Sequence, residues 1–421
     1  MLTRRHFLKS SAMAAPLILT PSMLGAIRRA QPNSRLGVGL IGCGKRMFEM
    51  VGEFLDQPDV QVLAVCDVDT TRREHVKSIV DRKYGTSDCR PIVDYRDMLS
   101  RKDIDAVVIG TPDHWHINQV MHAAMHGKDI YCEKPLTLNL RECQLMIDAV
   151  KKAGVVFQTG SQQRTEYDGK FRKAIEYIRS GRIGDILSVH VGVGTSSKWC
   201  DLGEEALEPG LEWDLWLGPA PKRPYHSTLS PRGVHNHYPQ WRLYREYSGG
   251  ILTDMGAHNF DIAQWGLGMD ASGPVEVHPP AEENAQFGAT LVYKNGTKVI
   301  HGGPDGTTFT GTRGVIHVFR GSLVSIPDGI LKQELKESDF HLPQVPRHIR
   351  NWLDCIKTRQ QPECNAEVGC RSIACAHLCN LAYWHKRPLK WDPQRWEFPG
   401  DAEANTWLDY SRRSGYELPK A

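Results

Sequence analysis

The sequence predicts an α/β fold, in which an N-terminal doubly wound parallel sheet precedes an α+β domain with an open, mostly antiparallel sheet. Short apolar runs alternate with helix-like stretches over 35–160, which favours a parallel sheet. A glycine-rich turn follows the first of these runs, and hairpin signals recur after residue 280. A chain of 421 residues is long enough for two domains with real cores.

Five strands are expected in the first domain because each is a short apolar run bounded by turn residues. They span 36–41, 60–67, 104–110, 129–132 and 155–160. Helices are expected between them at 45–55, 70–84, 116–126 and 139–153. We therefore assign 35–160 to a nucleotide-binding domain.

The pattern changes after about residue 165. A helix is expected at 169–180 and a long strand at 186–194. Asn295-Gly296 predicts a hairpin between 289–293 and 298–301, and Arg320-Gly321 a second one between 315–319 and 323–326. Helices are expected at 348–357 and 367–385. We assign 161–345 to an α+β substrate and oligomerisation domain, 346–395 to helices that pack back on the core, and 396–421 to a tail.

The N-terminus predicts export. Residues 3–9 read Thr-Arg-Arg-His-Phe-Leu-Lys and precede a small-residue apolar stretch, as in a twin-arginine signal peptide. The alternative is a basic amphipathic helix. Pro16 and Pro21 break the stretch, so no stable membrane span is expected after processing. Removing 1–30, with five basic residues and no acid, lowers the formal net charge from +3 to −2, which does not favour nucleic acid. We expect a periplasmic or otherwise exported protein.

Eleven cysteines are many for an exported chain. Cys370, Cys375 and Cys379 share one expected helix without the paired close spacing of a zinc site. We interpret them as core residues and expect no disulfide framework.

The glycine-rich turn predicts a cofactor site. Gly37 to Gly42 fits G-x-G-x-x-G but lies inside the expected strand, so the functional register is Gly42-Cys43-Gly44-Lys45-Arg46. Two glycines there allow a pyrophosphate to approach a helix N-terminus, as in a Rossmann domain. Asp67 ends the second strand roughly 20 residues later, where a carboxylate accepts from ribose hydroxyls. This favours NAD, although Arg72 keeps NADP open and Asp67 could instead cap a helix.

A turn after the third strand, Thr111-Pro112-Asp113-His114-Trp115-His116, is expected beside the nicotinamide. His114 and His116 alternate along an extended segment and could share a metal. No carboxylate or cysteine cluster accompanies them at ligand spacing, so no metal is predicted.

Two motifs predict the catalytic groups. Glu133-Lys134-Pro135 closes the fourth strand, so Lys134 lies where open α/β sheets bind ligands. Asp254 and His258 are four residues apart and share a face on a helix. His258 is a natural acceptor for a hydroxyl proton, and Asp254 can orient it or bind a neighbouring hydroxyl. A capping aspartate and a core histidine are the alternative.

The order Gly-x-Gly, Thr-Pro-x-x-x-His, Glu-Lys-Pro and Gly-Gly-x-x-x-Asp-x-Gly-x-His resembles the Gfo/Idh/MocA oxidoreductases over about 35–395. The resemblance implies a nicotinamide cofactor, oxidation of sugar or cyclitol alcohols, and a homo-oligomer, a dimer or tetramer. It makes Lys134, Asp254 and His258 the catalytic set and places Gln162 and Arg164 near the substrate or the nicotinamide. The chain departs from the family at Met47, the third glycine position, and at Asp113, where many members have Asn.

The predicted cofactor residues are Gly42, Gly44, Lys45, Arg46, Asp67, Thr111, Pro112, His116, Glu133, Lys134 and Gln162. The predicted substrate residues are Lys134, Arg164, His235, Tyr238, Arg242, Asp254 and His258. Residues 198–247, rich in aromatic and hydrogen-bonding side chains, are expected to shape a pocket for a carbohydrate.

Three functions remain open. The first is oxidation of a secondary hydroxyl of a sugar, cyclitol or glycoside, with a tightly bound cofactor that is recycled internally because free cofactor is scarce outside the cytoplasm. The second is an NAD-dependent glycosidase that oxidises the ring transiently and then eliminates the glycosidic group. The family's glycosidases carry a different His-Gly motif in place of Asp254 and His258. The third is a non-catalytic sugar-binding protein.

Overall fold

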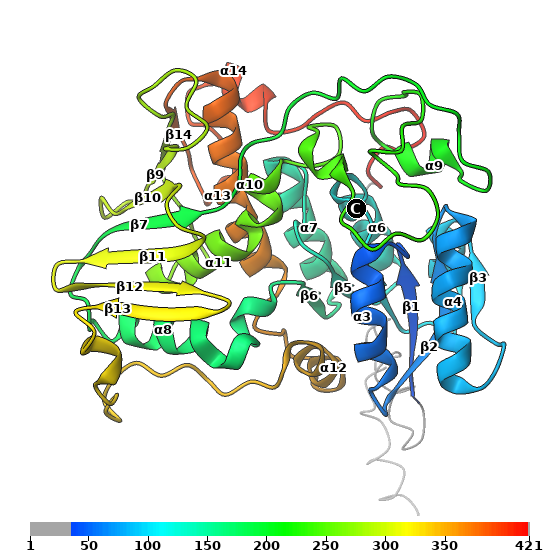
Figure 1. The fold of residues 1–421 in the computed structure, drawn as a ribbon, viewed down its shortest axis with the longest axis horizontal. Helices are drawn as coiled ribbons and strands as arrows, with labels where there is room; N and C mark the ends of the chain where they lie inside the picture. Colours follow the sequence, from blue (N-terminus) through cyan, green and yellow to red (C-terminus); the bar gives the residue numbers. More distant parts are fainter. Residues whose placement is uncertain (1–34, 420–421) are drawn as a thin grey trace, which may run out of the picture. The chain divides into compact units, whose positions relative to one another are not determined.

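The computed structural model describes residues 35–419; the predicted export signal lies outside the described residues. The first domain is a six-stranded sheet of order β3-β2-β1-β4-β5-β6 in which every pairing is parallel. Its strands are β1 (Leu36–Ile41), β2 (Val60–Cys66), β3 (Arg90–Ile92), β4 (Ala106–Ile109), β5 (Asp129–Cys132) and β6 (Phe157–Thr159). The doubly wound parallel sheet is therefore confirmed (Figure 1).

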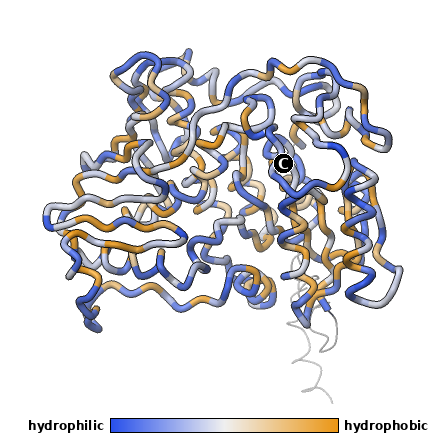
Figure 2. Tube along the Cα trace, viewed as in Figure 1, coloured by the Kyte–Doolittle hydropathy of each residue, from blue (hydrophilic) through white to orange (hydrophobic). Residues whose placement is uncertain are grey.

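Helices cover both faces of this sheet. They are α3 (Lys45–Leu55), α4 (Thr70–Tyr84), α5 (Tyr95–Ser100), α6 (Asp113–Met125) and α7 (Leu140–Ala153). Apolar residues of α3 and α4 pack on one face and those of α5, α6 and α7 on the other. Because both faces are covered, the strands are apolar along their length, as the hydropathy colouring of β1 shows (Figure 2).

The structure differs from the sequence-based expectation at three places in this domain. It adds the edge strand β3 and the short helix α5, and α6 begins at Asp113 instead of His116. Pro112 precedes that helix with φ −60° and ψ 151°, an extended conformation that proline favours. Asp113 thereby becomes part of the first helical turn.

The second domain contains an eight-stranded sheet of order β13-β12-β11-β7-β10-β9-β8-β14. Its strands are β7 (Ile186–Gly192), β8 (Glu276–His278), β9 (Thr290–Val292), β10 (Lys298–His301), β11 (Gly306–Gly311), β12 (Gly314–Phe319), β13 (Ser322–Ile326) and β14 (Leu389–Lys390). Among these described strands β7 pairs in parallel with β10, and the other pairings are antiparallel. Both predicted hairpins are present; β8, β11 and β14 were not expected.

Helices cover one face of this second sheet. The larger ones are α8 (Lys170–Arg179), α11 (Gly256–Leu267) and α13 (Ala366–His385), with the short α10 (Ile251–Asp254) before α11. Phe309 and Val189 of the sheet are buried in the same core as Phe260 of α11. The other face of the sheet exposes Val324 and Ile326 on β13.

The C-terminal elements join the two domains. Trp352 of α12 (His348–Thr358) is buried in the core formed by α3 and β1, and α13 contacts both α7 and α11. The last described residues also pack: Phe398 is buried, and Arg412 forms a 2.7 Å ion pair with Glu142 of α7. Short elements α9 (Trp213–Leu217) and α14 (Ala402–Thr406) complete this part.

The eleven cysteines are free thiols, and all except the partly exposed Cys200 are buried. Burial raises the pKa of thiols such as Cys379, so these groups stay protonated and pack as small apolar side chains. Over residues 35–419 no helix is long and apolar enough to cross a membrane.

Candidate active site

The glycine turn lies between β1 and α3. Gly42 has φ +84°, and a Cβ atom there would lie 2.7 Å from the Gly110 carbonyl carbon. Glycine is therefore required. Gly44 precedes α3 with open space beside it and no side-chain cap on the helix. Uncapped N–H groups at a helix N-terminus behind a glycine turn fit the pyrophosphate of a dinucleotide.

Asp67 follows β2 and braces this turn. Its carboxylate accepts from the Cys43 N–H at 2.6 Å and from the Asp69 N–H at 2.8 Å. Burial raises its pKa, although these bonds and the charge of Arg72 oppose that effect. Asp67 lines the groove beside the turn, and carboxylate oxygens have lone pairs left for ribose hydroxyls.

Arg72 is the residue that left NADP possible as the cofactor. Other groups of the protein bind its guanidinium. Its guanidinium donates to the Ser230 hydroxyl at 3.2 Å and to the carbonyls of Pro231 and Gly233. It also lies 3.4 Å from the Asp69 carboxylate. These contacts engage the donors of the Arg72 guanidinium within the protein.

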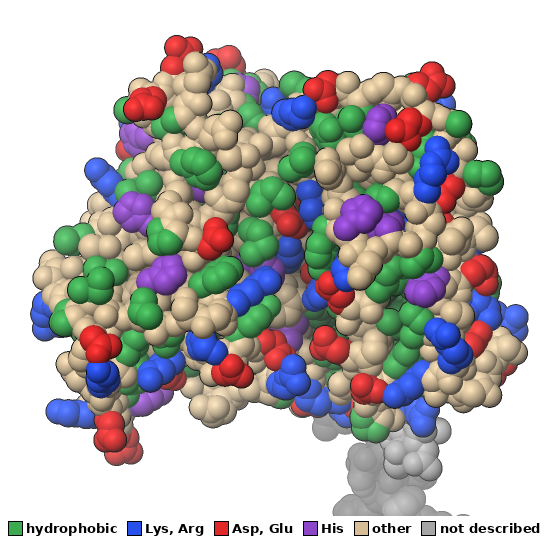
Figure 3. Space-filling model, in the orientation of Figure 1, with side chains coloured by type: hydrophobic (Ala, Val, Ile, Leu, Met, Phe, Trp, Pro, Cys, Tyr) green, Lys and Arg blue, Asp and Glu red, His purple; other side chains and the backbone are tan. Residues whose placement is uncertain are grey.

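Two cavities meet between the domains. A groove along the glycine turn is lined by seven predicted cofactor residues, Gly42, Gly44, Lys45, Arg46, Asp67, Thr111 and Pro112. A larger cavity of about 1000 Å³ is lined by Glu133, Lys134, Gln162, Asp254 and His258. Both are bordered by Arg46, Thr111, Tyr238, Trp241 and Arg242. Figure 3 shows charged side chains in the hollow between the domains.

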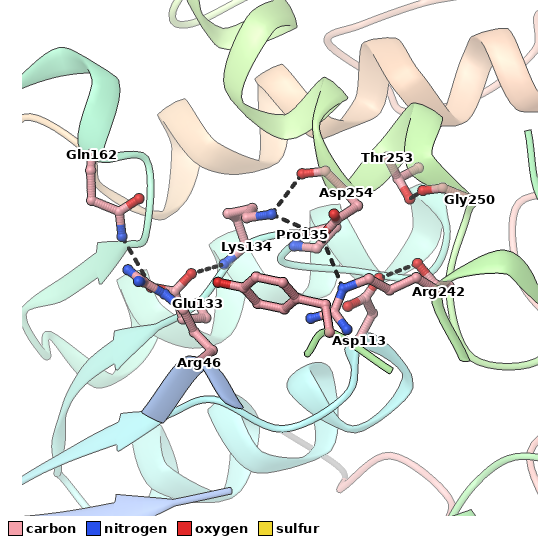
Figure 4. Close-up of polar contacts among 12 residues, drawn as sticks. Arg46, Asp113, Glu133, Lys134, Pro135, Gln162, Arg242, Gly250, Thr253 and Asp254 are labelled. Atoms are coloured by element: carbon pink, nitrogen blue, oxygen red, sulfur yellow. Dashed lines mark hydrogen bonds and ion pairs between the residues drawn. The ribbon is translucent and has the colours of Figure 1, made fainter. Parts of the chain in front are cut away.

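Lys134 lies just beyond β5, in a turn whose Lys134–Pro135 peptide is cis. Its Nζ donates at 2.8 Å to both the Oδ1 and the backbone oxygen of Asp254, and Arg242 Nε lies 3.3 Å from the same Oδ1 (Figure 4). Burial opposes ionisation of Asp254, but these two cations outweigh it and lower its pKa. One ionised carboxylate thus fixes two cations at the edge of the cavity.

His258 lies in α11 beside this pair. Its side chain is buried, and its Nδ1 has no hydrogen-bond partner among residues 35–419. Burial, followed by the charges of Lys134 and Arg320, lowers its pKa well below the usual value. The imidazole is therefore neutral and able to accept a proton.

Asp254 and His258 do not act as the predicted pair. The Asp254 carboxylate bonds to Lys134 and Arg242, and no hydrogen bond joins it to His258 in the described chain. The expectation that Asp254 orients the histidine is corrected: two cations compete for the carboxylate more strongly than a neutral ring does.

Glu133 links the glycine turn to the cavity. Its Oε1 lies 2.9 Å from Arg46 Nη2 and accepts from Gln162 Nε2 at 3.0 Å. Burial disfavours its charge, but Arg46 outweighs burial and lowers the pKa of Glu133. The three predicted residues form one network between the two cavities.

Two family profiles match the chain. The profile "Oxidoreductase family, NAD-binding Rossmann fold" covers residues 36–161. The profile "Oxidoreductase family, C-terminal alpha/beta domain" covers residues 169–418, which is more than half of the chain. The chain belongs to the Gfo/Idh/MocA oxidoreductase family.

Family relatives differ in their named activities. The "Uncharacterized oxidoreductase YrbE" of Bacillus subtilis (strain 168) is 26% identical over 82% of this chain and 94% of its own. "Glycosyl hydrolase family 109 protein 1" of Shewanella sp. (strain MR-4) is 28% identical over 59% of this chain and 54% of its own. The WlbA dehydrogenase from Bordetella pertussis, solved with NADH and UDP-GlcNAcA, has a TM-score of 0.59 at 20% identity, covering 85% of this chain and 98% of that one. This likeness shows the shared fold.

Three predicted site residues lie elsewhere than expected. His116 is buried and bonds the carbonyls of Pro135 and Thr111, so it supports the Lys134 turn and lines neither cavity. His235 lines the cofactor groove, not the larger cavity predicted for the substrate.

Arg164 is also corrected. It is 1% exposed, pairs with Asp261 at 2.7 Å and with Asp270 at 2.7 Å, and lines neither cavity. Two carboxylates satisfy its guanidinium inside the second domain, which makes it a structural residue rather than a substrate ligand.

Sequence reasoning missed three residues that line the larger cavity: Asp113 as an ionisable group, His348 and Arg320. Asp113 accepts from the Ser248 hydroxyl at 2.6 Å, and burial raises its pKa to about 7. Its departure from the family's Asn was the available signal. His348 and Arg320 come from distant segments and belong to no motif.

Within 35–419 no group of three or more His, Cys, Asp or Glu side chains is arranged to hold a metal ion. His114 and His116 each bond to backbone carbonyls instead.

Proposed function

We propose that this chain is an exported, NAD-dependent oxidoreductase that acts on a secondary hydroxyl of a sugar, cyclitol or glycoside and retains its cofactor. The observation that carries the proposal is the meeting of Lys134, Asp254 and His258 at the junction of a dinucleotide groove and a large polar cavity. Membership in the family supports the oxidoreductase class.

The residues divide the chemistry between them. The nicotinamide, when bound, supplies the hydride acceptor. Lys134 donates a hydrogen bond to the reacting oxygen and stabilises negative charge that develops there. Neutral His258 accepts the hydroxyl proton. Asp254 holds Lys134 in position with a 2.8 Å ion pair.

Cofactor retention is supported by a covering segment, residues 198–247, which runs above α3 and α4 (Figure 1). Arg72 holds this segment through the bonds described above, and two further bonds do the same. Asn236 accepts from Lys45 Nζ at 2.7 Å, and Tyr238 donates to Glu49 at 2.6 Å. The segment has its own apolar core around Trp216 and Tyr247.

The groove beneath the covering segment has a free volume of about 100 Å³, whereas ligand pockets usually hold roughly 300–1,000 Å³. We propose that the segment moves outward when a dinucleotide enters or leaves. Breaking its hydrogen bonds makes release slow, which suits a cofactor that is oxidised and reduced in place.

A redox-assisted glycosidase is the second candidate, favoured by the 28% identity to the Shewanella glycosyl hydrolase family 109 protein. Its chemistry would begin at the same Lys134 site. A non-catalytic sugar-binding protein is the third, and the presence of Lys134, Asp254 and His258 in one cavity argues against it.

One experiment separates these candidates. The purified protein is denatured and the released nicotinamide identified; intact protein is then incubated with sugars and aryl glycosides. We expect bound NAD and a change in reduced-cofactor absorbance with a sugar. Aglycone release without net redox change indicates the glycosidase, and neither signal indicates a binding protein.

Export is part of the proposal. It rests on the twin arginines Arg4 and Arg5 and the apolar stretch after them. Replacing both arginines with lysine should keep the protein in the cytoplasm, as measured by cell fractionation; unchanged periplasmic yield contradicts a twin-arginine route.

A further inference from the structure

Arg320 is placed to bind a ligand that the protein itself does not provide. It lies in the turn between β12 and β13 and lines the larger cavity together with Lys134 and His258. Its guanidinium carbon lies 5.2 Å from the centre of the Tyr167 ring. Within 35–419 no protein acceptor bonds to this guanidinium, and its Nε is buried without a partner.

The other arginines of the cavity are paired. Arg46 lies 2.9 Å from Glu133, Arg242 lies 3.3 Å from Asp254, and Arg347 lies 2.8 Å from Glu166. Leaving a charged donor half-buried and unpaired costs free energy unless a ligand supplies the anion. Arg320 is thus the cavity arginine, in the described chain, whose donors are available.

Charge near His258 favours an anion. Lys134 and Arg242 share the single carboxylate of Asp254, and the charge of Arg320 also reaches the His258 ring. The wall also carries other acidic groups. Glu133, next to Lys134, is paired with Arg46, and Asp113 accepts from the Ser248 hydroxyl. Glu166 is paired with Arg347 and Asp168 with Lys170, and Glu49 and Glu53 belong to α3.

Resting on the proposed function, we infer that the substrate carries an anionic substituent, a carboxylate or a phosphate, which Arg320 binds while the reacting hydroxyl lies at Lys134 and His258. The planar guanidinium fork matches both groups bidentately. Sugar acids or sugar phosphates are therefore preferred over neutral sugars.

Two sets of sugars test the inference, and each set contains an acid, a phosphate and a neutral sugar of the same stereochemistry. The first set is glucuronate, glucose 6-phosphate and glucose, and the second is galacturonate, galactose 6-phosphate and galactose. Binding to the protein with its cofactor is measured by calorimetry, and kcat and KM by reduced-cofactor absorbance. We expect at least one anionic sugar to bind about 10-fold or more tighter than its neutral counterpart. The comparison between acid and phosphate identifies the group.

Variants sharpen the test. Arg320→Gln should raise KM and Kd for the anionic sugar about 10-fold or more and should change Kd for the neutral sugar much less. Arg320→Lys should recover part of this. Arg313→Gln is the matched control, because Arg313 lies in the β11–β12 turn at the other end of β12, outside both cavities, and donates to the Gly181 carbonyl.

Equal binding of neutral and anionic sugars, or equal losses for both in Arg320→Gln, overturns the inference. If the protein nevertheless oxidises neutral sugars, the proposed oxidoreductase function is still supported. Conversely, selective binding of an anionic sugar without any redox change supports the Arg320 site while the oxidoreductase proposal fails.

Discussion

Burial and nearby charge have opposing electrostatic effects at the site formed by Lys134, Asp254, Arg242 and His258. Burial alone would neutralise Asp254, yet two adjacent cations keep its pKa low. Burial, followed by the charges of Lys134 and Arg320, lowers the pKa of His258 and keeps its ring neutral. The site thus holds a charged donor and a neutral acceptor side by side, which alcohol oxidation requires.

The raised pKa of Asp113 predicts that the stability of the protein depends on pH. Burial raises this pKa to about 7, well above the usual value of an aspartate, so the folded protein binds its proton more tightly than the unfolded chain. Stability is therefore lost as the pH rises from about 4 to about 7. Asp113→Asn, which keeps an oxygen for Ser248, should be more stable than the native protein at pH 8, by roughly 1–4 kcal/mol.

Denaturant unfolding at pH 5 and pH 8 measures this difference. The advantage of Asp113→Asn should shrink at pH 5, where the native carboxyl is mostly protonated. Asp97→Asn, on the short helix α5 and outside both cavities, is the control. A stability difference that does not change between the two pH values contradicts a titrating Asp113.

At the scale of elements, we propose that the covering segment 198–247 governs cofactor exchange. Arg72→Met removes the bonds from α4 to Ser230 and to the carbonyls of Pro231 and Gly233. Hydrogen bonds of this kind contribute about 0.5–1.5 kcal/mol each, so losing those to three partners should quicken cofactor release roughly 10-fold or more.

Exchange of bound NAD for labelled NAD measures that rate. Lys77→Met, on the same helix but bonded to Asp81, should exchange as the native protein does. Tyr238→Phe removes one hydroxyl contact to Glu49 and should also quicken release. Native exchange rates in both Arg72→Met and Tyr238→Phe would show that the segment does not retain the cofactor.

Strands were predicted correctly where both of their faces are buried. The runs at 36–41 and 129–132 are strands because parallel strands covered on both faces are continuously apolar. Strand β3 was missed because its three residues lie at an edge and are partly exposed. Strand β11 was missed because Gly306–Gly311 is built from glycine and threonine with one phenylalanine, without a clear apolar alternation.

Several predicted site residues lie just after a strand of the first sheet, and these residues border the cavities. Lys134, Asp67 and the glycine turn are of this kind, and the structure places them at the cavities. Side-chain partners could not be predicted, because Arg164 with Asp261 and Lys134 with Asp254 meet across long stretches of chain. Arg320 also lies far in sequence from the motifs that predicted the cavity.

On the scale of the whole molecule, we propose a homo-oligomer formed through the open face of the second sheet. Val324 is 53% and Ile326 70% exposed on β13. Apolar and histidine side chains gather on the side of the molecule where β11 to β13 lie (Figure 3). Val324→Lys with Ile326→Lys should lower the molar mass in solution, measured by light scattering.

Met125→Lys is the control for that change, because Met125 is 59% exposed at the end of α6 in the first domain. It should leave the molar mass unaltered. A native protein that is monomeric, or a double variant with the native mass, contradicts assembly through this sheet face.

The most direct measurement of the central claim is a single turnover of the cofactor-loaded protein, followed by reduced-nicotinamide absorbance after mixing with a sugar that the native protein oxidises. Lys134→Met should keep its bound NAD, because Lys134 lies outside the glycine-turn groove, yet react roughly 10²–10⁴-fold more slowly. Lys170→Met, which loses an exposed pair with Asp168, should react as the native protein does. A Lys134→Met protein that retains its cofactor and reacts at the native rate would contradict the account.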